Sequence, residues 1–341
     1  MKTSFSFIIL LFLFLNTRAQ KNDLEYSVLF YNVENLFDVE NDSLTNDDEF
    51  TFEGERHWNY KKLSNKLQNT AKAIVGSSGW ELPVLIGLCE IENRYVLEKL
   101  VDETSLTPAD YKIIHKESPD SRGIDVALLY QSDLFYPLKY EYYPFVQNNN
   151  KILNTREILY VEGVVDGIDT LHVFVNHWPS RYSGVMETRD LRNEAAQLLR
   201  SKIDLLLNEN INSKVIILGD FNDQPNDESI RKYLNSEFLD NEVLNTQLYN
   251  LSGEWIGNNT GTLKYQSQWF IFDQIIVSGA LLTSATGLYT ETSWAEICNL
   301  PFLLETDASN GGLKPKRTYN GYKYNGGFSD HLPVKLKLKV H

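Results

Sequence analysis

The sequence predicts an α/β fold in which two sheets stack on each other and helices cover their outer faces. Predicted strands outnumber predicted helices, and several strands, such as 83–90 and 214–220, are nearly continuous apolar runs. Strands of this kind are buried on both faces, so they need cover on both sides. Two stacked sheets with outer helices provide that cover. No repeat, low-complexity linker or abrupt change of composition divides residues 20–341, so we expect a single domain.

The predicted elements begin with a strand and a helix and continue mostly as strands. Each helix places apolar residues three or four positions apart, as Leu63, Leu67 and Ala71 do in the first one. Each strand is an apolar or alternating run bounded by turn-forming residues. The predicted helices are 59–74, 92–103 and 187–208. The predicted strands are 26–33, 83–90, 111–115, 124–130, 158–165, 171–177, 214–220, 269–278 and 334–340.

Residues 1–19 are expected to be a secretory signal peptide. Lys2 precedes an apolar run, 5–15, and small or polar residues ending in Ala19 follow that run. The run is too short to span a bilayer comfortably, and no cysteine follows it to suggest a lipid anchor. We therefore expect cleavage near Ala19, export to the periplasm or the extracellular space, and no stable insertion in a membrane.

The net charge argues against tight binding of nucleic acid by charge alone. The formal charge is −14, and removing the two positive charges of Lys2 and Arg18 brings it to −16. Proteins that bind DNA without sequence preference usually present a basic face. An acidic enzyme can still meet a phosphate through a metal ion, because the ligands of that ion are themselves acidic.

Polar side chains collect where the predicted strands end. Six strand ends carry an acid, an amide or an imidazole, namely Asn32, Glu90, His177, Asp220 with Asn222, Asp273, and Asp330 with His331. Most of these residues have an ordinary structural explanation when taken alone, such as a turn or a helix cap. Asp273 is harder to explain in that way, because a carboxylate inside an apolar strand needs a partner. The joint pattern favours a functional site, since such sites are often built from strand ends.

The chemistry that these residues favour is metal-assisted hydrolysis of a phosphate ester. Glu90 can be a ligand of Mg²⁺, which prefers one or two carboxylates together with water and phosphate oxygens. His331, held by a carboxylate, can act as the base for the attacking water. The candidate donors to the phosphate are His177, Asn222, Asn32, Arg122 and Arg181. The sequence has no P-loop, no GxSxG, no HExxH and no Cys-His zinc spacing.

Seven segments, in this order, resemble the endonuclease/exonuclease/phosphatase superfamily, which includes pancreatic-type deoxyribonucleases and bacterial sphingomyelinases. They are FYNVENLF (30–37), GLCEIEN (87–93), RGIDVALLY (122–130), VNHWPSR (175–181), LGDFNDQP (218–225), FDQIIVS (272–278) and SDHLPV (329–334). The resemblance covers essentially the whole chain after the predicted signal peptide. Its most specific part is GDFN together with SDH. The motifs YNVENLFD and NHWPSR are similar to those of exported members of this superfamily from Bacteroidetes-type bacteria.

The resemblance implies a four-layer α/β/β/α sandwich of two mixed sheets with outer helices, and a site where the two sheets open. It implies Mg²⁺, with Mn²⁺ or Ca²⁺ as alternatives. The implied roles are metal binding for Glu90, Asn32 and Asp330, phosphate binding for His177 and Asn222, orientation or activation of water for Asp220, positioning of the histidines or the metal for Asp273 and Asp330, and general base or transition-state stabiliser for His331. Whether Asp220 or His331 accepts the proton stays open.

Three functions are compatible with these residues. The first is an exported phosphodiesterase or endonuclease that cleaves nucleic acid, and the second is a hydrolase of small phosphoesters such as inositol phosphates or phospholipid headgroups. The third is an inactive binding module, which is disfavoured because every motif residue is present. We expect a monomer with a phosphoester substrate and no protein partner.

Two loops lie outside the seven segments that resemble the superfamily. The segment 292–327 is long, aromatic and basic at its end, and we expect it to face the substrate, with Arg317 or Tyr319 as contacts. The acidic segment 39–49 is expected to be solvated surface.

Overall fold

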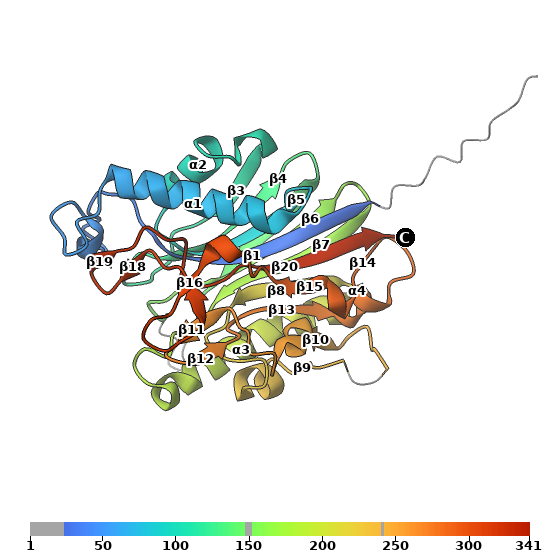
Figure 1. Ribbon diagram of the computed structural model, residues 1–341. Coiled ribbons are helices and arrows are strands. Elements are labelled where there is room, and N and C mark those ends of the chain that lie inside the picture. The colour runs from blue at the N-terminus through green and yellow to red at the C-terminus, as the bar shows by residue number, and fades with distance from the viewer. Residues whose placement is uncertain (1–23, 147–151, 240–241) are drawn as a thin grey trace, which may run out of the picture.

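Two seven-stranded sheets lie face to face, and helices cover the outer side of each sheet (Figure 1). The computed structural model describes residues 24–146, 152–239 and 242–341, so the predicted signal peptide lies outside the described residues and stays a prediction. The layers form the α/β/β/α sandwich of mixed sheets that the sequence predicts. No helix in these described ranges is long and apolar enough to cross a membrane.

The first sheet contains the N-terminal and C-terminal strands of the described chain. In sheet order it consists of β14 (Leu288–Tyr289), β20 (Val334–Val340), β1 (Glu25–Leu36), β2 (Leu85–Ile91), β4 (Asp125–Gln131) and β3 (Tyr111–His115), with β15 (Ala295–Ile297) also paired to β20. Strands β1 and β2 are parallel, whereas the other pairs of this sheet are antiparallel.

The second sheet is built from the middle of the chain. In order it consists of β5 (Phe135–Tyr143), β6 (Ile158–Val165), β7 (Asp169–His177), β8 (Lys214–Asp220), β13 (Asp273–Ser278), β10 (Leu248–Asn250) and β9 (Ser236–Glu237). Strands β7 and β8 are parallel and in register, which places His177 beside Asp220. Gly219 permits this close approach, because a Cβ at that position would meet the backbone oxygen of Asn176 at 2.5 Å.

Apolar residues alternate along the strands and fill three separate layers. On β1, Phe30 faces the second sheet, whereas the preceding Leu29 packs under the outer helices. Helices α1 (Tyr60–Ser78) and α2 (Arg94–Asp102) cover the first sheet, and α3 (Val185–Glu209) covers the second (Figure 1). A short helix, α4 (Gly279–Thr283), follows β13. The side chains of Asn59 and Asn93 cap α1 and α2 by accepting from the backbone N–H groups of Lys62 and Val96.

The predicted strand 269–278 is wrong as a single element. It is divided into β12 (Gln268–Phe270) and β13, because Ile271 and Phe272 belong to neither strand, and the backbone N–H groups of Phe272 and Asp273 both donate to Thr262 Oγ1. Three hairpins then extend beyond the sheets at the end where the site lies (Figure 1). They are β11 (Leu263–Tyr265) with β12, β16 (Leu304–Thr306) with β17 (Leu313–Pro315), and β18 (Tyr319–Asn320) with β19 (Lys323–Tyr324).

Candidate active site

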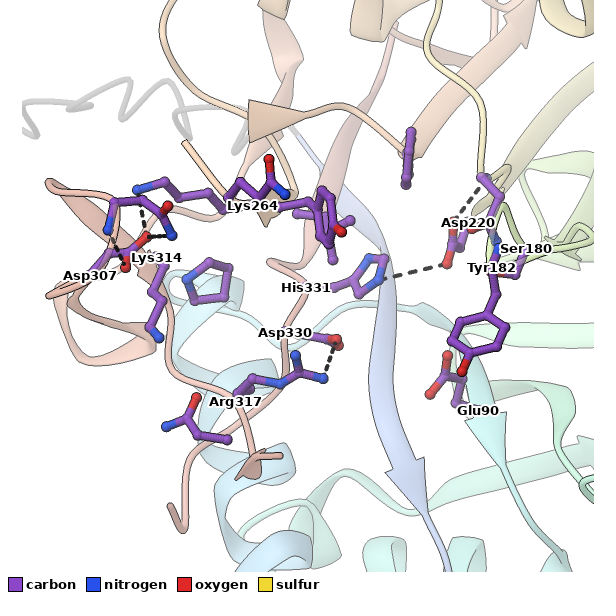
Figure 2. Close-up of a pocket in the computed structure, with 18 of the residues that line it drawn as sticks. Glu90, Ser180, Tyr182, Asp220, Lys264, Asp307, Lys314, Arg317, Asp330 and His331 are labelled. Atoms are coloured by element: carbon purple, nitrogen blue, oxygen red, sulfur yellow. Dashed lines mark hydrogen bonds and ion pairs between the residues drawn. The ribbon is translucent and has the colours of Figure 1, made fainter. Parts of the chain in front are cut away.

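A cavity of about 480 Å³ opens where strands of both sheets end, and it brings together most of the predicted site residues (Figure 2). The predicted residues that line it are Glu90, Arg122, His177, Asp220, Asn222, Asp330 and His331. Asn32 and Asp273 are fully buried and do not line the cavity, although both contact residues that do. Arg181 does not line the cavity either, and of the lining residues it contacts only Asn222, through the backbone oxygen, and the ring of Phe272.

Strand register explains why residues distant in sequence meet here. Asp220 pairs with His177 across the parallel β7–β8 ladder and with Asp273 across the antiparallel β8–β13 ladder. In the first sheet, Asn32 lies opposite Cys89, so Glu90 begins just beyond that pair. The ends of the two sheets therefore present one continuous polar surface.

Glu90 reaches the cavity because its backbone leaves the ladder. Its φ of 62° lies in the left-handed region, and the pairing of β2 with β4 shifts between Cys89 and Ile91. Such a conformation costs free energy for a residue with a side chain, so the surrounding structure must hold it. The backbone N–H of Asn35, itself left-handed at φ 55°, donates to Glu90 Oε2 at 2.9 Å. Two strained backbone segments thus fix one carboxylate.

Asn32 connects the two carboxylates of the site. Its Nδ2 donates to Asp220 Oδ2 at 3.0 Å and to Glu90 Oε1 at 3.3 Å, while its Oδ1 accepts from the backbone N–H of Glu34 at 3.0 Å. An amide nitrogen is no ligand for a hard cation. These contacts favour a positioning role for Asn32, whose predicted contact with metal or substrate stays a prediction.

His331 is held by Asp273, which is 58 positions away in the sequence. The distance from His331 Nδ1 to Asp273 Oδ2 is 2.6 Å, and His331 Nε2 lies 3.8 Å from Asp220 Oδ2. The neighbouring Asp330 points elsewhere and forms an ion pair with Arg317 at 2.9 Å. The carboxylate that orients the ring of His331 is therefore Asp273, a long-range partner.

The two imidazoles have opposite protonation preferences. Burial lowers the pKa of His177 well below its usual value, and Arg156 and Arg122 lower it further. Burial also lowers the pKa of His331, but the charges of Asp273 and Asp220 outweigh that effect and raise the pKa well above its usual value. The pKa of Asp220 is raised, chiefly by burial. His177 is therefore neutral at neutral pH, and His331 is a cation between two carboxylates.

Arg317 was expected as one of two substrate contacts in the segment 292–327, and it does line the cavity. It also bridges Asp330 and Glu34, each at 2.9 Å. Tyr319, the other expected contact, is buried away from the cavity and donates its hydroxyl to the backbone oxygen of Arg56. The hairpins around Arg317 supply further lining residues, among them Lys264, Tyr265, Asn310, Lys314 and Asn320.

Arg181 does not line the cavity, so its predicted contact with the substrate is not supported. Its guanidinium forms ion pairs with Asp223 and Asp227, and its Nε donates to the backbone oxygen of Asn222 at 2.6 Å. The neighbouring residues Ser180 and Tyr182 line the cavity instead. The guanidinium is already neutralised by two carboxylates, so it braces the loop after β8.

A buried network behind the cavity was missed by the sequence analysis. Lys66 of α1 is buried and donates to Thr318 Oγ1 and to the backbone oxygen of Phe328. Glu34, also buried, accepts from Arg317 and from the backbone N–H of Thr318. Burial lowers the pKa of Lys66 to about 8. Its position three residues after Leu63 places it on the apolar face of α1, but nothing in the sequence identifies its partners.

Oxygen-rich side chains in the cavity fit a divalent cation. Glu90 and Asp330 are carboxylates that line it, and Figure 2 shows both directed toward the same open space. A second group is Asp220, Asp273 and His331, whose ligand atoms all lie within 4.8 Å of one another. In the second group His331 Nδ1 and Asp273 Oδ2 are already hydrogen bonded to each other, so a metal there would displace that bond.

The fold and the site define a four-layer sandwich protein with acids and imidazoles gathered at its strand ends. A profile of the Endonuclease/Exonuclease/phosphatase family matches residues 27–340. The chain therefore belongs to this family, whose members are phosphoester hydrolases. No curated protein matches the sequence.

Solved structures of other proteins share the fold at low sequence identity. The human Nocturnin catalytic domain with bound sulfate anion is similar with a TM-score of 0.56 and 11% identity, over 94% of this chain and 96% of that one. D. rerio TDP2 complexed with single strand DNA product gives 0.53 and 14%, over 93% and 99%. An endonuclease/exonuclease/phosphatase family protein from Bacteroides thetaiotaomicron gives 0.53 and 15%, over 94% and 99%. These likenesses show the fold.

Proposed function

We propose that this protein is a divalent-metal-dependent phosphodiesterase that cleaves nucleic acid. The observation that carries the proposal is the arrangement around Asp220, whose Oδ2 lies 3.8 Å from the Nε2 atoms of both His177 and His331. These separations are too long for direct hydrogen bonds. They leave a position at which a water or a phosphate oxygen would contact a carboxylate and two imidazoles.

The proposed roles follow from what each group can donate or accept. Asp220 accepts the proton of the attacking water, because it is the carboxylate that faces both imidazoles. His331, oriented by Asp273, donates from Nε2 to the charge that develops on the phosphate. His177 and Arg122, which also line the cavity, bind the phosphate. Asn222 uses Nδ2 to donate to the backbone oxygen of Trp178 at 3.1 Å, so its second N–H remains for substrate.

Glu90 and Asp330 would hold the cation, and we propose Mg²⁺ because that ion needs few protein carboxylates. When bound, it would neutralise charge on the phosphate and on the leaving oxygen. Asn32 bridges Glu90 and Asp220 by donating to both carboxylates.

Nucleic acid is supported as the substrate by one neighbour. The D. rerio TDP2 structure holds a single strand DNA product, and its chain aligns with 93% of this one. The second candidate is a small phosphoester. It is favoured by the net charge of −14, which provides no general attraction for a polyanion, and by the hairpins that wall one side of the cavity.

Substituting Glu90 with Gln is expected to raise the Mg²⁺ concentration needed for half-maximal activity by at least about tenfold, since it removes one ligand charge. A metal titration of activity measures this. Asp273→Asn serves as the comparison, because it belongs to the other candidate metal group. An unchanged requirement in Glu90→Gln together with a raised one in Asp273→Asn would move the metal to Asp220, Asp273 and His331.

The experiment that tests the function uses the purified protein and its His331→Ala variant with Mg²⁺. Supercoiled plasmid and bis-p-nitrophenyl phosphate are incubated in parallel, with and without EDTA. EDTA-sensitive nicking by the wild type, absent in the variant, is the expected result. Cleavage of the small diester with intact plasmid would favour the second candidate, and no cleavage of either would contradict both.

A further inference from the structure

Two exposed tyrosine rings lie at the rim of the catalytic cavity, and the roles proposed above use neither of them. Tyr182 is 97% exposed and Tyr265 is 65% exposed, and both residues line the cavity. A single exposed tyrosine is ordinary on a protein surface. Two on the rim of one cavity form a rigid, amphipathic surface that a flat ligand can cover.

Tyr182 belongs to the segment that follows His177 at the end of β7. The backbone N–H of Gly184 donates to the backbone oxygen of Arg181 at 2.9 Å, which closes a turn around Tyr182. The Arg181 guanidinium anchors this turn, because it forms ion pairs with the loop after β8, one of them with Asp223. Arg181 therefore acts on the cavity by fixing the turn that carries Tyr182.

Tyr265 belongs to a hairpin that is attached to His331. Leu263 of β11 and His331 form an isolated antiparallel bridge, and Tyr265 follows Leu263 by two positions on the same strand. The intervening Lys264 has a side chain that is only 4% exposed, and its ammonium pairs with Asp307 of the neighbouring hairpin at 3.1 Å. The hairpin is thus held at both the catalytic histidine and the cavity wall.

The two rings flank the position proposed for the scissile phosphate. That position lies between the Nε2 atoms of His177 and His331, and each ring belongs to the chain segment next to one of these imidazoles. Figure 2 shows Tyr182 on one side of His331 and Lys264, the chain neighbour of Tyr265, on the other. The bases on the two sides of the phosphate would therefore each meet one ring.

The cations of the cavity supply little free charge for a polyanion. Each lysine and arginine that lines it pairs with a carboxylate, and the pairs are Arg122–Asp120, Lys264–Asp307, Lys314–Glu305, and Arg317 with both Glu34 and Asp330. Arg122 keeps part of its charge, because Asp120 also pairs with Arg156. Most nucleic-acid binders gain affinity from basic side chains that displace counterions. In a chain of net charge −14, uncharged contacts must supply more of that affinity.

We propose that Tyr182 and Tyr265 are stacking platforms for the bases beside the cleaved phosphate, and that the substrate is single-stranded nucleic acid bound mainly through its bases. This inference rests on the proposed nucleic-acid phosphodiesterase function. Aromatic side chains bind bases of any sequence, because every base has a π face. In a duplex the neighbouring pairs cover those faces, so only unpaired bases can stack on both rings.

The test measures oligonucleotide binding by fluorescence anisotropy in the presence of Mg²⁺, with His331→Ala as the parent so that the strand is not cleaved. Three ligands of equal length are compared: a strand of thymidines, an abasic strand that carries the same charge, and a duplex. The thymidine strand is expected to bind at least about tenfold more tightly than the abasic strand, and more tightly than the duplex. Equal binding of the two single strands would overturn the proposal, because charge alone would then supply the affinity.

Substitutions in the same parent assign the stacking to the two rings. Tyr182→Ala and Tyr265→Ala are each expected to weaken binding of the thymidine strand by about five- to 150-fold, the usual contribution of one stacked base, and to leave the abasic strand unaffected. Tyr182→Phe and Tyr265→Phe keep the ring and are expected to bind as the parent does. Tyr136→Ala is the matched control, because Tyr136 is 69% exposed on β5 and does not line the cavity.

Cleavage by the wild type separates this inference from the proposed function. If the wild type cleaves neither plasmid nor single strands, the proposed function fails and the inference fails with it. If it cleaves nucleic acid but prefers the duplex, or if the two Ala variants bind the thymidine strand as tightly as their parent, only the inference fails. Phe variants that bind as weakly as the Ala variants would also overturn it, since the ring would then not be the contact.

Discussion

Replacing Asp220 with Asn is expected to lower turnover by about two to four powers of ten, the usual contribution of a positioned acid–base group. Asp220 Oδ2 is the oxygen that faces both imidazole Nε2 atoms, and the amide of Asn cannot accept a proton from water. Single-turnover or steady-state rates on the cleaved diester measure the effect. Asp227→Asn is the matched control, because Asp227 lies in the same loop but does not line the cavity.

The substitution also disturbs local hydrogen bonds, so folding must be measured beside activity. Asp220 Oδ1 accepts from the backbone N–H of Asn222, and Oδ2 accepts from Asn32 Nδ2, both at 3.0 Å. An amide has one oxygen, so one donor loses its acceptor at a cost of about 1–3 kcal/mol in stability. A retained far-ultraviolet circular dichroism spectrum at the assay temperature distinguishes lost chemistry from lost structure.

The double variant Asp220→Asn/His331→Ala tests whether the two residues act as a unit. We expect it to be no slower than the slower single variant by more than about tenfold, since groups that serve one step are strongly non-additive. Rates that multiply would show independent roles. If Asp220→Asn alone keeps turnover within about tenfold of the wild type, Asp220 is not a catalytic residue.

The sequence predicts well which polar residues lie at the ends of buried strands. Apolar runs locate β2 and β8, and a carboxylate at the end of each, Glu90 and Asp220, follows directly. The parallel register of β7 and β8 then places His177 beside Asp220. The sequence does not state this register, but it follows once the two strands are neighbours whose ends lie at the same edge. The layers are predictable for the same reason, because apolar periodicity decides which faces are buried.

The partners of the site side chains are less predictable. Asp330 and His331 are adjacent in sequence, and neighbours in an extended chain point to opposite sides, so His331 finds Asp273 and Asp330 finds Arg317. Which pair forms depends on the break between β12 and β13 at 271–272, which places Asp273, and the apolar run 269–278 conceals that break. Periodicity therefore locates these residues without identifying their contacts.

The sequence analysis also failed to identify the groups that pair with charged side chains. Arg181 resembles a phosphate-binding residue in sequence, but Asp223 and Asp227, more than forty positions later, neutralise it. Lys66 lies on the buried face of α1 and is explained only by oxygen atoms of Thr318 and Phe328, about 250 positions away. Such pairings are set by tertiary contacts that no local pattern records.

Replacing Arg156 with Met is expected to lower the free energy of unfolding by about 3–5 kcal/mol, the usual cost of removing one partner of a buried ion pair. Arg156 is 4% exposed, and its Nη1 donates to Asp120 Oδ2 at 2.9 Å. Its Nη2 donates to the backbone oxygen of Trp178 at 2.7 Å. The Met side chain fills the volume but leaves a buried carboxylate and a carbonyl oxygen without these donors. Urea denaturation followed by tryptophan fluorescence measures the loss.

An exposed ion pair of the same kind provides the control. Arg94 and Glu98 are paired at 2.9 Å on α2, but their side chains are 53% and 51% exposed. Arg94→Met is therefore expected to change stability by no more than about 1 kcal/mol. The contrast between the two Arg→Met variants isolates burial from the loss of a charge.

Combining Arg156→Met with Asp120→Asn shows why the loss of Arg156 lowers stability. If the cost of Arg156→Met comes from the uncompensated Asp120 carboxylate, neutralising that carboxylate in the double variant is expected to restore part of the stability. Arg122 limits the restoration, because its Nε lies 3.5 Å from Asp120 Oδ1 and already offsets some of the charge. A loss below about 1 kcal/mol in Arg156→Met would mean that Arg122 moves to Asp120 instead. Because Arg122 lines the cavity, that movement would lower activity while stability stayed nearly unchanged.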